Sequence, residues 1–203
     1  NKENQINEIL WALNITGYEC KYSDPRFSKT YEYGIFREQY MTLEEYKKKY
    51  FDSSRPYTVG LLESNMYVSN GQLQPYYALI KSLEAKGCNV IPVVAAGGSE
   101  NQLKVMVKYF TNAPSYEAYL NNPLKYTNNV NAIISMPAYG IGGNLFDNTT
   151  KYFETAGVPV FRAVHSDYVS NEEWELSVTG LPGNRSDKWW HVAIGEAQGI
   201  IEA

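Results

Sequence analysis

Short apolar runs alternate with segments of helical spacing from residue 57 onward. The runs have the length of buried strands, and the segments between them place apolar residues three and four positions apart, as a helix with one buried face requires. The predicted strands are 57–62, 89–94, 131–135 and 158–164, and the predicted helices are 75–86, 100–110 and 145–156. This alternation predicts an α/β fold: a parallel sheet of Rossmann-like or flavodoxin-like type in a three-layer domain.

The first 53 residues show no such alternation. Apolar residues at helical spacing end at Gly17, where a helix is expected to stop. A Tyr-rich stretch, 18–40, is interpreted as irregular, and Thr42 with Glu45 forms a capping box that predicts a short helix through Lys49. We therefore expect an N-terminal partly helical segment over 1–53 and an α/β domain over 54–203.

The predicted sheet also indicates where a ligand would bind. In parallel α/β sheets, ligands lie beyond the carboxyl ends of the strands. The segments that follow the first three predicted strands are 63–72, 95–100 and 137–144, so a cleft is expected between these loops.

Two of these loops are rich in glycine. Gly97-Gly98 and 140–143 (GIGG) either cradle an anion at a helix N-terminus or make tight strand-to-helix turns. Neither matches the dinucleotide fingerprint or the phosphate-binding P-loop, which requires Lys and Ser or Thr after its last glycine. No nucleotide site is therefore predicted.

Candidate chemical groups are few. His165 follows the fourth strand, which is the position of a proton carrier or metal ligand, but His191 lies far away in the sequence and two such histidines make a weak metal pattern. Glu196 is either a solvated turn residue or a functional acid. Trp189 and Trp190 cannot both face inward on one strand, so one of them is a candidate platform for a flat ligand.

Composition excludes several classes of function. The formal net charge is −4 and no stripe of Lys and Arg is present, which argues against nucleic-acid binding. Cys20 and Cys88 are too few for a disulfide framework. No apolar run approaches the roughly 20 residues of a membrane span, and no signal peptide is visible, so a cytoplasmic protein without membrane contact is expected. The opening Asn1 suggests an internal segment of a longer chain.

Several stretches, in order and at similar spacing, resemble the large subunit of the cobalt and magnesium chelatases, the family that includes cobaltochelatase CobN and its magnesium-chelatase counterpart. They span about residues 34–201, which is most of this chain but a small part of such a subunit. The matching stretches are Gly34-Ile35-Phe36, 43–46, 57–62, 83–92 (LEAKGCNVIP), 131–135, 158–160, Glu173-Trp174, Gly180-Leu181 and 192–199 (VAIGEAQG).

The resemblance implies a fragment of an ATP-dependent enzyme that inserts a divalent metal, cobalt or magnesium, into a tetrapyrrole ring. The metal is substrate, and no cofactor is expected on this segment. ATP is implied to be used by separate AAA-type partner subunits, which agrees with the missing P-loop. The fragment is not expected to be active alone.

The resemblance also implies site residues. Metal insertion removes two pyrrole protons, so a carboxylate or imidazole is required as base. Glu196 occupies the acidic position of the family's PElDG motif, and it is assigned as catalytic together with His165. No metal ligand is assigned. The predicted ring-binding residues are Asn65, Tyr67, Gly71, Gly142, Gly143 and Trp190.

Departures from the family's motifs argue against a magnesium-specific role. Gln198 stands where the PElDG motif has its Asp, so one acidic group is lost. In the first loop, Asn65, Tyr67 and Gln72 replace the Arg, His and Asp of the magnesium-type pattern. A CobN-like role on a corrin in cobalamin synthesis, or a divergent paralogue, fits these residues better.

Two hypotheses of a different class stay open. The chain is alternatively a small-ligand binding module resembling one lobe of a periplasmic sensor, with no chemistry of its own. The other hypothesis is a scaffold domain that docks the ATPase subunits while the ring binds elsewhere.

Overall fold

The computed structural model describes residues 2–24, 33–96, 100–137, 141, 146–163, 170–178 and 201–202. The chain divides into two compact units, Asn1–Tyr31 and Glu32–Ala203.

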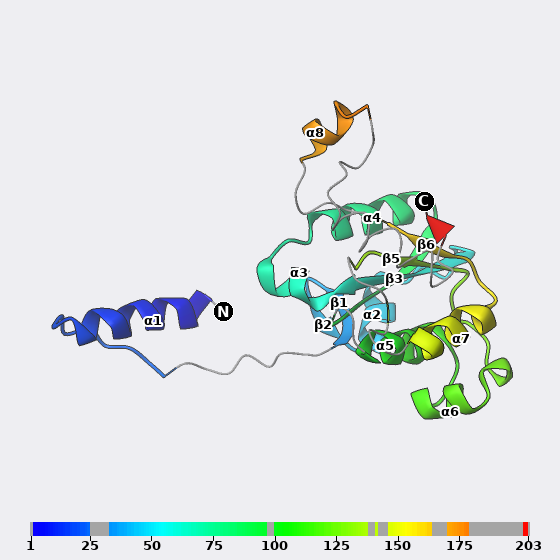
Figure 1. Cartoon of the computed structure of the whole chain (residues 1–203), viewed down its shortest axis with the longest axis horizontal. Coiled ribbons are helices and arrows are strands. Elements are labelled where there is room, and N and C mark those ends of the chain that lie inside the picture. Colours follow the sequence, from blue (N-terminus) through cyan, green and yellow to red (C-terminus); the bar gives the residue numbers. More distant parts are fainter. Residues whose placement is uncertain are drawn as a thin grey trace. The chain divides into compact units, whose positions relative to one another are not determined.

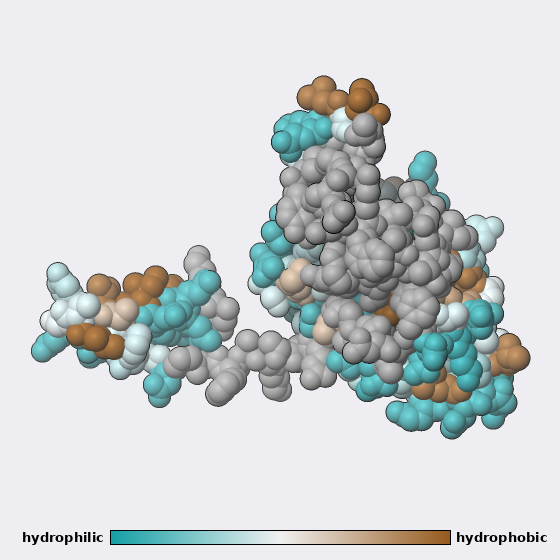
Figure 2. Space-filling model, viewed as in Figure 1, coloured by the Kyte–Doolittle hydropathy of each residue, from teal (hydrophilic) through white to brown (hydrophobic). Residues whose placement is uncertain are grey.

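The first unit is built on one helix, α1 (Lys2–Ile15), which confirms the helix expected before Gly17. Gly17 ends it in a left-handed conformation with a φ of 97°. The chain after the turn is tied back to the helix, because Ser23 donates its backbone N–H to the Asn7 side chain at 3.0 Å. Apolar side chains lie on the surface of this unit (Figure 2), among them Ile9 and Trp11, which are 61% and 49% exposed.

The second unit contains a seven-stranded sheet with the order β2-β1-β4-β3-β5-β6-β7 among the described residues. Its strands are β1 (Tyr33–Arg37), β2 (Gln39–Met41), β3 (Tyr57–Ser64), β4 (Cys88–Ala95), β5 (Ala132–Ser135), β6 (Val160–Arg162) and β7 (Ile201–Glu202). The pairs β3–β4, β3–β5 and β5–β6 are parallel, as the sequence predicted. The α/β fold class is therefore confirmed.

The prediction that residues 18–40 are irregular is wrong for the last residues of that stretch. Residues 33–41 form the antiparallel hairpin of β1 and β2, and β1 extends the sheet by pairing with β4, Tyr33 opposite Ala95. Strands of five and three residues are too short to show alternation. Their turn also lacks the Asn-Gly sequence that usually marks a hairpin. Glu38, which is not a glycine, adopts the positive φ of 65° in this turn.

Helices cover both faces of the sheet (Figure 1). The helices of this unit are α2 (Leu43–Tyr50), α3 (Asn65–Asn70), α4 (Gln74–Ala85), α5 (Glu100–Phe110), α6 (Tyr116–Asn121), the 3-10 helix η1 (Pro123–Lys125), α7 (Phe146–Ala156) and α8 (Asn171–Glu175). Helices α3 and α4 supply side chains to the core on one face, and α5, α6 and α7 supply those on the other. Helix α2 begins at the predicted capping box, in which Glu45 donates its N–H to Thr42 Oγ1 at 3.2 Å.

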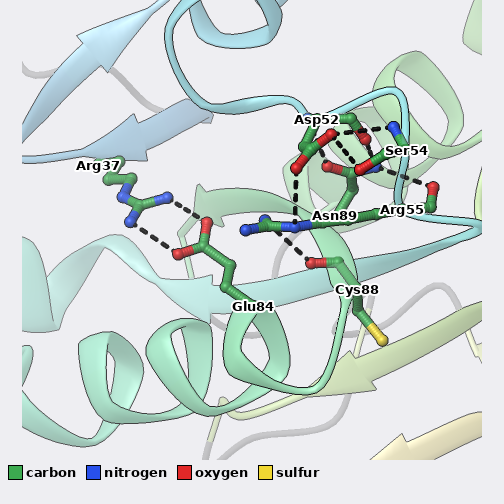
Figure 3. A network of polar contacts seen from close by, with 7 residues as sticks. All are labelled: Arg37, Asp52, Ser54, Arg55, Glu84, Cys88 and Asn89. Carbon is green, nitrogen blue, oxygen red and sulfur yellow. Dashed lines mark hydrogen bonds and ion pairs between the residues drawn. The ribbon is translucent and has the colours of Figure 1, made fainter.

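Polar contacts hold the elements around β4 together, away from the carboxyl ends of the strands (Figure 3). Arg37 of β1 forms two hydrogen bonds with the Glu84 carboxylate of α4, at 2.5 and 3.0 Å. At the start of β4, the buried Asn89 side chain accepts from the Asp52 N–H at 2.9 Å and donates to the Asp52 carbonyl at 2.8 Å. A single amide thus fixes the loop that leads into β3.

Replacing Asn89 with alanine is expected to lower the free energy of unfolding by about 1.5 kcal/mol, because the backbone groups of Asp52 lose their partner where water has little access. Urea unfolding of the chain measures the change. Asn121→Ala is the matched control, since Asn121 is exposed and should change stability little. Equal stability of the two variants would contradict the role given to Asn89.

Candidate functional site at the carboxyl edge of the sheet

The carboxyl ends of the four parallel strands meet at one edge of the sheet. Ser64 at the end of β3 lies opposite Ala95 of β4, and Ser135 at the end of β5 lies opposite Leu62 of β3 and Arg162 of β6. The chain passes from β3 to β4 on one side and later adds β5 on the other. The crossover direction therefore reverses between β3 and β5, and a crevice at such a reversal is the usual ligand position in open α/β sheets.

The first loop of the predicted cleft is mostly helical. Ser64 caps α3 by accepting the Met66 N–H at 3.3 Å, and Gly71 ends the helix with a φ of 70°. Three residues predicted to bind the ring lie here. Asn65 opens the helix and is half-buried, and Tyr67 is 3% exposed, in the core cluster that contains Leu61 and Met136.

The described geometry gives each of the three a local role. Asn65 is the first residue beyond the strand edge, Tyr67 anchors α3 on the sheet, and Gly71 permits the left-handed helix end. Contact of these residues with a ring stays a prediction. The other predicted site residues, His165, Glu196, Gly142, Gly143 and Trp190, lie outside the described residues.

Buried hydrogen bonds anchor both flanks of the segment after β5. Arg162, fully buried at the end of β6, donates to the Pro137 carbonyl at 2.5 Å. Thr149 of α7, also buried, donates its hydroxyl to the Ile141 carbonyl at 2.9 Å. A buried arginine and a helix thus hold the chain at the edge where the glycine-rich loop was expected.

Sequence reasoning missed the buried polar groups of this edge. Glu63 is 2% exposed, and Ser135 and Arg162 are fully buried. Each stands at the carboxyl end of an otherwise apolar strand, and this position was the available signal. A polar residue that ends a buried strand needs a hydrogen-bond partner or a function, because burying an unpaired polar group is costly.

Tyr76 lies on the sheet face covered by α3 and α4, and its pKa is raised there. Burial raises the pKa of the Tyr76 hydroxyl well above its ordinary value, and the charges of Tyr46 and Glu63 add to the shift. Tyr76 donates its hydroxyl to the Phe36 carbonyl at 2.8 Å. Tyr76 is therefore a neutral structural donor at any physiological pH.

The described part of the chain contains no group of three or more His, Cys, Asp or Glu side chains suited to hold a metal ion. Within the same residues, none of the helices has the length and apolar character needed to cross a bilayer. The buried polar side chains of the edge include the Glu63 carboxylate, the Arg162 guanidinium and the hydroxyls of Ser64 and Ser135.

Comparison with known proteins identifies the family. The sequence model of the family described as CobN/Magnesium Chelatase matches residues 1–203, the whole chain. The chain belongs to this family. The resemblance seen in the sequence is thereby confirmed.

Curated relatives of this CobN/Magnesium Chelatase chain are several times longer than the chain itself. An uncharacterized protein of Methanocaldococcus jannaschii is 29% identical over 174 residues, which cover 80% of this chain and 13% of the relative. The chloroplastic magnesium-chelatase subunit ChlH of Oryza sativa, in both subspecies indica and japonica, is 28% identical over 191 residues, or 85% of this chain and 13% of the relative. The chain thus spans about an eighth of their length.

A solved structure shows that the fold is shared. The catalytic subunit of cobaltochelatase from Mycobacterium tuberculosis superimposes with a TM-score of 0.56 at 15% sequence identity. The match covers 94% of this chain and 14% of that subunit. The α/β arrangement described above therefore recurs as one part of that much larger subunit.

Proposed function

We propose that this chain is part of the large subunit of an ATP-dependent tetrapyrrole metal chelatase, in which it contributes to ring binding and metal insertion. The observation that carries the proposal is the family match over all 203 residues. The strand-order reversal between β3 and β5 supports it, because it gives the segment an edge of the kind at which α/β sheets bind ligands.

In this proposal the ring lies at the carboxyl edge, against Asn65 and Gly71 after β3 and against Gly142, Gly143, Tyr67 and Trp190. The divalent cation, cobalt or magnesium, is substrate. The replacements at Asn65, Tyr67 and Gln72 favour cobalt and a corrin, and with it a ligase of cobalamin synthesis in the cytoplasm. AAA-type partner subunits hydrolyse the ATP.

Insertion of a metal into the ring requires bases. Each insertion breaks two pyrrole N–H bonds and replaces them with bonds from nitrogen to the metal, so two protons must leave the ring. We assign one proton to Glu196, and His165 serves as a second carrier that passes protons to water. Neutral imidazole accepts a proton near physiological pH, which suits this role.

A titration tests the proposal directly. Metal-free porphyrins and corrinoids are added to the chain while ring absorbance and fluorescence are recorded, and a saturable shift with micromolar affinity is expected. Asn65→Leu should weaken that affinity, and the exposed Asn121→Leu should leave it unchanged.

Absence of any shift with the chain, and again with a full-length subunit, would contradict ring binding here. A shift with the full-length subunit alone would favour the scaffold hypothesis, in which this segment docks the ATPase subunits. Affinity for a sugar or an amino acid in place of a ring would favour the small-ligand module.

A further inference from the structure

Helix α1 carries a stripe of apolar side chains that are exposed to solvent. The stripe occupies positions i, i+3, i+4 and i+7 of the helix, which share one face, and its members are Ile6, Ile9, Leu10 and Leu13. Ile6, Ile9 and Leu13 are 50%, 61% and 39% exposed, and Leu10 is half-buried. These four residues, here named the α1 stripe, form part of the apolar surface of the first unit (Figure 2).

The described polar contacts that fold this unit use another face of the helix. Asn7 and Asn14 are seven residues apart and therefore lie on the same side of α1. Asn7 accepts the Ser23 N–H at 3.0 Å, and Asn14 donates to the Cys20 carbonyl at 2.7 Å. At 3.6 residues per turn, this side lies about a quarter of a turn from the α1 stripe. The segment after the helix thus runs back along the asparagines and leaves the stripe open.

The charges of α1 favour a protein partner over a membrane surface. Helices that lie on membranes are rich in Lys and Arg on their polar face. The sequence of α1 contains one basic residue, Lys2, and two acidic residues, Glu3 and Glu8. Apolar grooves of proteins, in contrast, bind helices through anchors at i, i+3, i+4 and i+7, which is the spacing of the α1 stripe.

The α1 stripe is too small to hold a separate molecule firmly. Stable interfaces engage about 20–30 residues of each partner. Pairing of two copies as a coiled coil requires an apolar repeat over about three to four heptads, and the stripe spans about one. A partner in the same polypeptide needs far less contact, because the linkage gives it an effective concentration in the millimolar range. The family model includes α1, and the curated relatives contain much more chain than this segment.

We propose that the α1 stripe docks into an apolar groove formed by another part of the same large subunit. The proposal rests on the function proposed above only in taking this chain as part of such a subunit. Ile9 is the most exposed member of the stripe and serves as its central anchor. The contact fixes the first unit against the remainder of the subunit.

Hydrogen exchange, measured by mass spectrometry, tests the proposal in the 203-residue chain and in a full-length subunit. The amides of α1 are expected to exchange about 10-fold or more slowly in the full-length subunit, because docking suppresses the opening of a short helix. Helix α5, whose side chains pack in the core of this chain, is the internal reference. Its exchange should be similar in both proteins.

A double variant tests the stripe itself. Ile9→Glu with Leu13→Glu in the full-length subunit should return the exchange of α1 to the rate seen in the 203-residue chain. Glutamate is a good helix former, so the change acts on the contact more than on the helix. Unchanged exchange of α5 shows that the variant is folded. The matched control, Glu8→Lys, alters the charge of an exposed residue on another face and should keep α1 protected.

Four outcomes would overturn the proposal. Equal exchange of α1 in the two proteins would mean that nothing in the subunit covers the stripe. Slow exchange in the 203-residue chain at every concentration would mean that the stripe is covered within this chain, and slowing with increasing concentration would make a second copy the partner. Protection that arises only when ATPase subunits are added would assign the stripe to a separate protein.

Ring binding and metal insertion are measured separately from exchange, so the two levels of inference fail separately. If the wild-type subunit protects α1 but neither binds a ring nor inserts a metal, the proposed function fails and the docking stands. If the wild type is active and α1 exchanges as fast as in the 203-residue chain, only the docking fails.

Discussion

Glu196→Gln in a full-length subunit is expected to abolish metal insertion and to leave ring binding intact. The variant keeps the size and hydrogen-bonding shape of the side chain and removes the group that takes up a pyrrole proton, which is worth about 100-fold or more in rate. Glu196 lies outside the described residues, so this expectation rests on its match to the acidic position of the chelatase motif and on the chemistry. Metal-dependent change of the ring spectrum measures insertion, and fluorescence quenching measures binding.

The matched control is Glu172→Gln, which removes one negative charge from an exposed residue of α8. It should insert metal at the wild-type rate. Wild-type insertion by Glu196→Gln would remove Glu196 from the mechanism, and loss of ring affinity in that variant would make Glu196 a binding residue.

Gly60→Ala is expected to lower the free energy of unfolding by about 3 kcal/mol, at the upper end of the range for overpacked cores. Gly60 lies in β3, opposite Ile91 on one side and Ile133 on the other, so the strand cannot shift without disturbing both neighbours. A methyl group at this position would lie 2.8 Å from two ring carbons of Phe110, which is fully buried at the end of α5. Urea unfolding measures the loss.

Two further variants test the cause. Gly60→Ala combined with Phe110→Leu should recover part of the loss, because the shorter side chain leaves room for the methyl group. Gly34→Ala lies in β1, near the edge of the sheet, where the added carbon would lie 3.3 Å from the Tyr40 ring, a looser contact than the one at Gly60, and it should cost much less. Additive effects of Gly60→Ala and Phe110→Leu would show that their contact is not the source of the instability.

The contact between Gly60 and Phe110 also bears on the site. Gly60 lies three residues before Glu63 on the same strand, and α5 lies directly against β3 and β4. Close packing of helix on strand makes the position of the carboxyl edge rigid, and proton transfer requires groups held in place.

The strands and helices of the parallel sheet could be predicted from local sequence. The runs around Val59, Val90 and Ile133 are apolar, bounded by turns and separated by helical spacing, and these properties require no knowledge of distant contacts. The order and spacing of short motifs were also sufficient to predict the family, since these motifs span most of the chain. The capping box of Thr42 and Glu45 was predictable because both partners lie within one turn.

Which polar groups are buried together became apparent only in the folded chain. The hairpin at 33–41 joins the sheet because β4 offers an open edge, and nothing in the short sequence of the hairpin indicates that partner. Strand order placed β3 between β4 and β5, and so made Glu63 a carboxylate at the reversal point of the sheet. Burial of a side chain depends on atoms far apart in the sequence, so Glu63 and Arg162 resemble ordinary strand-end charges until the layers around them are assembled.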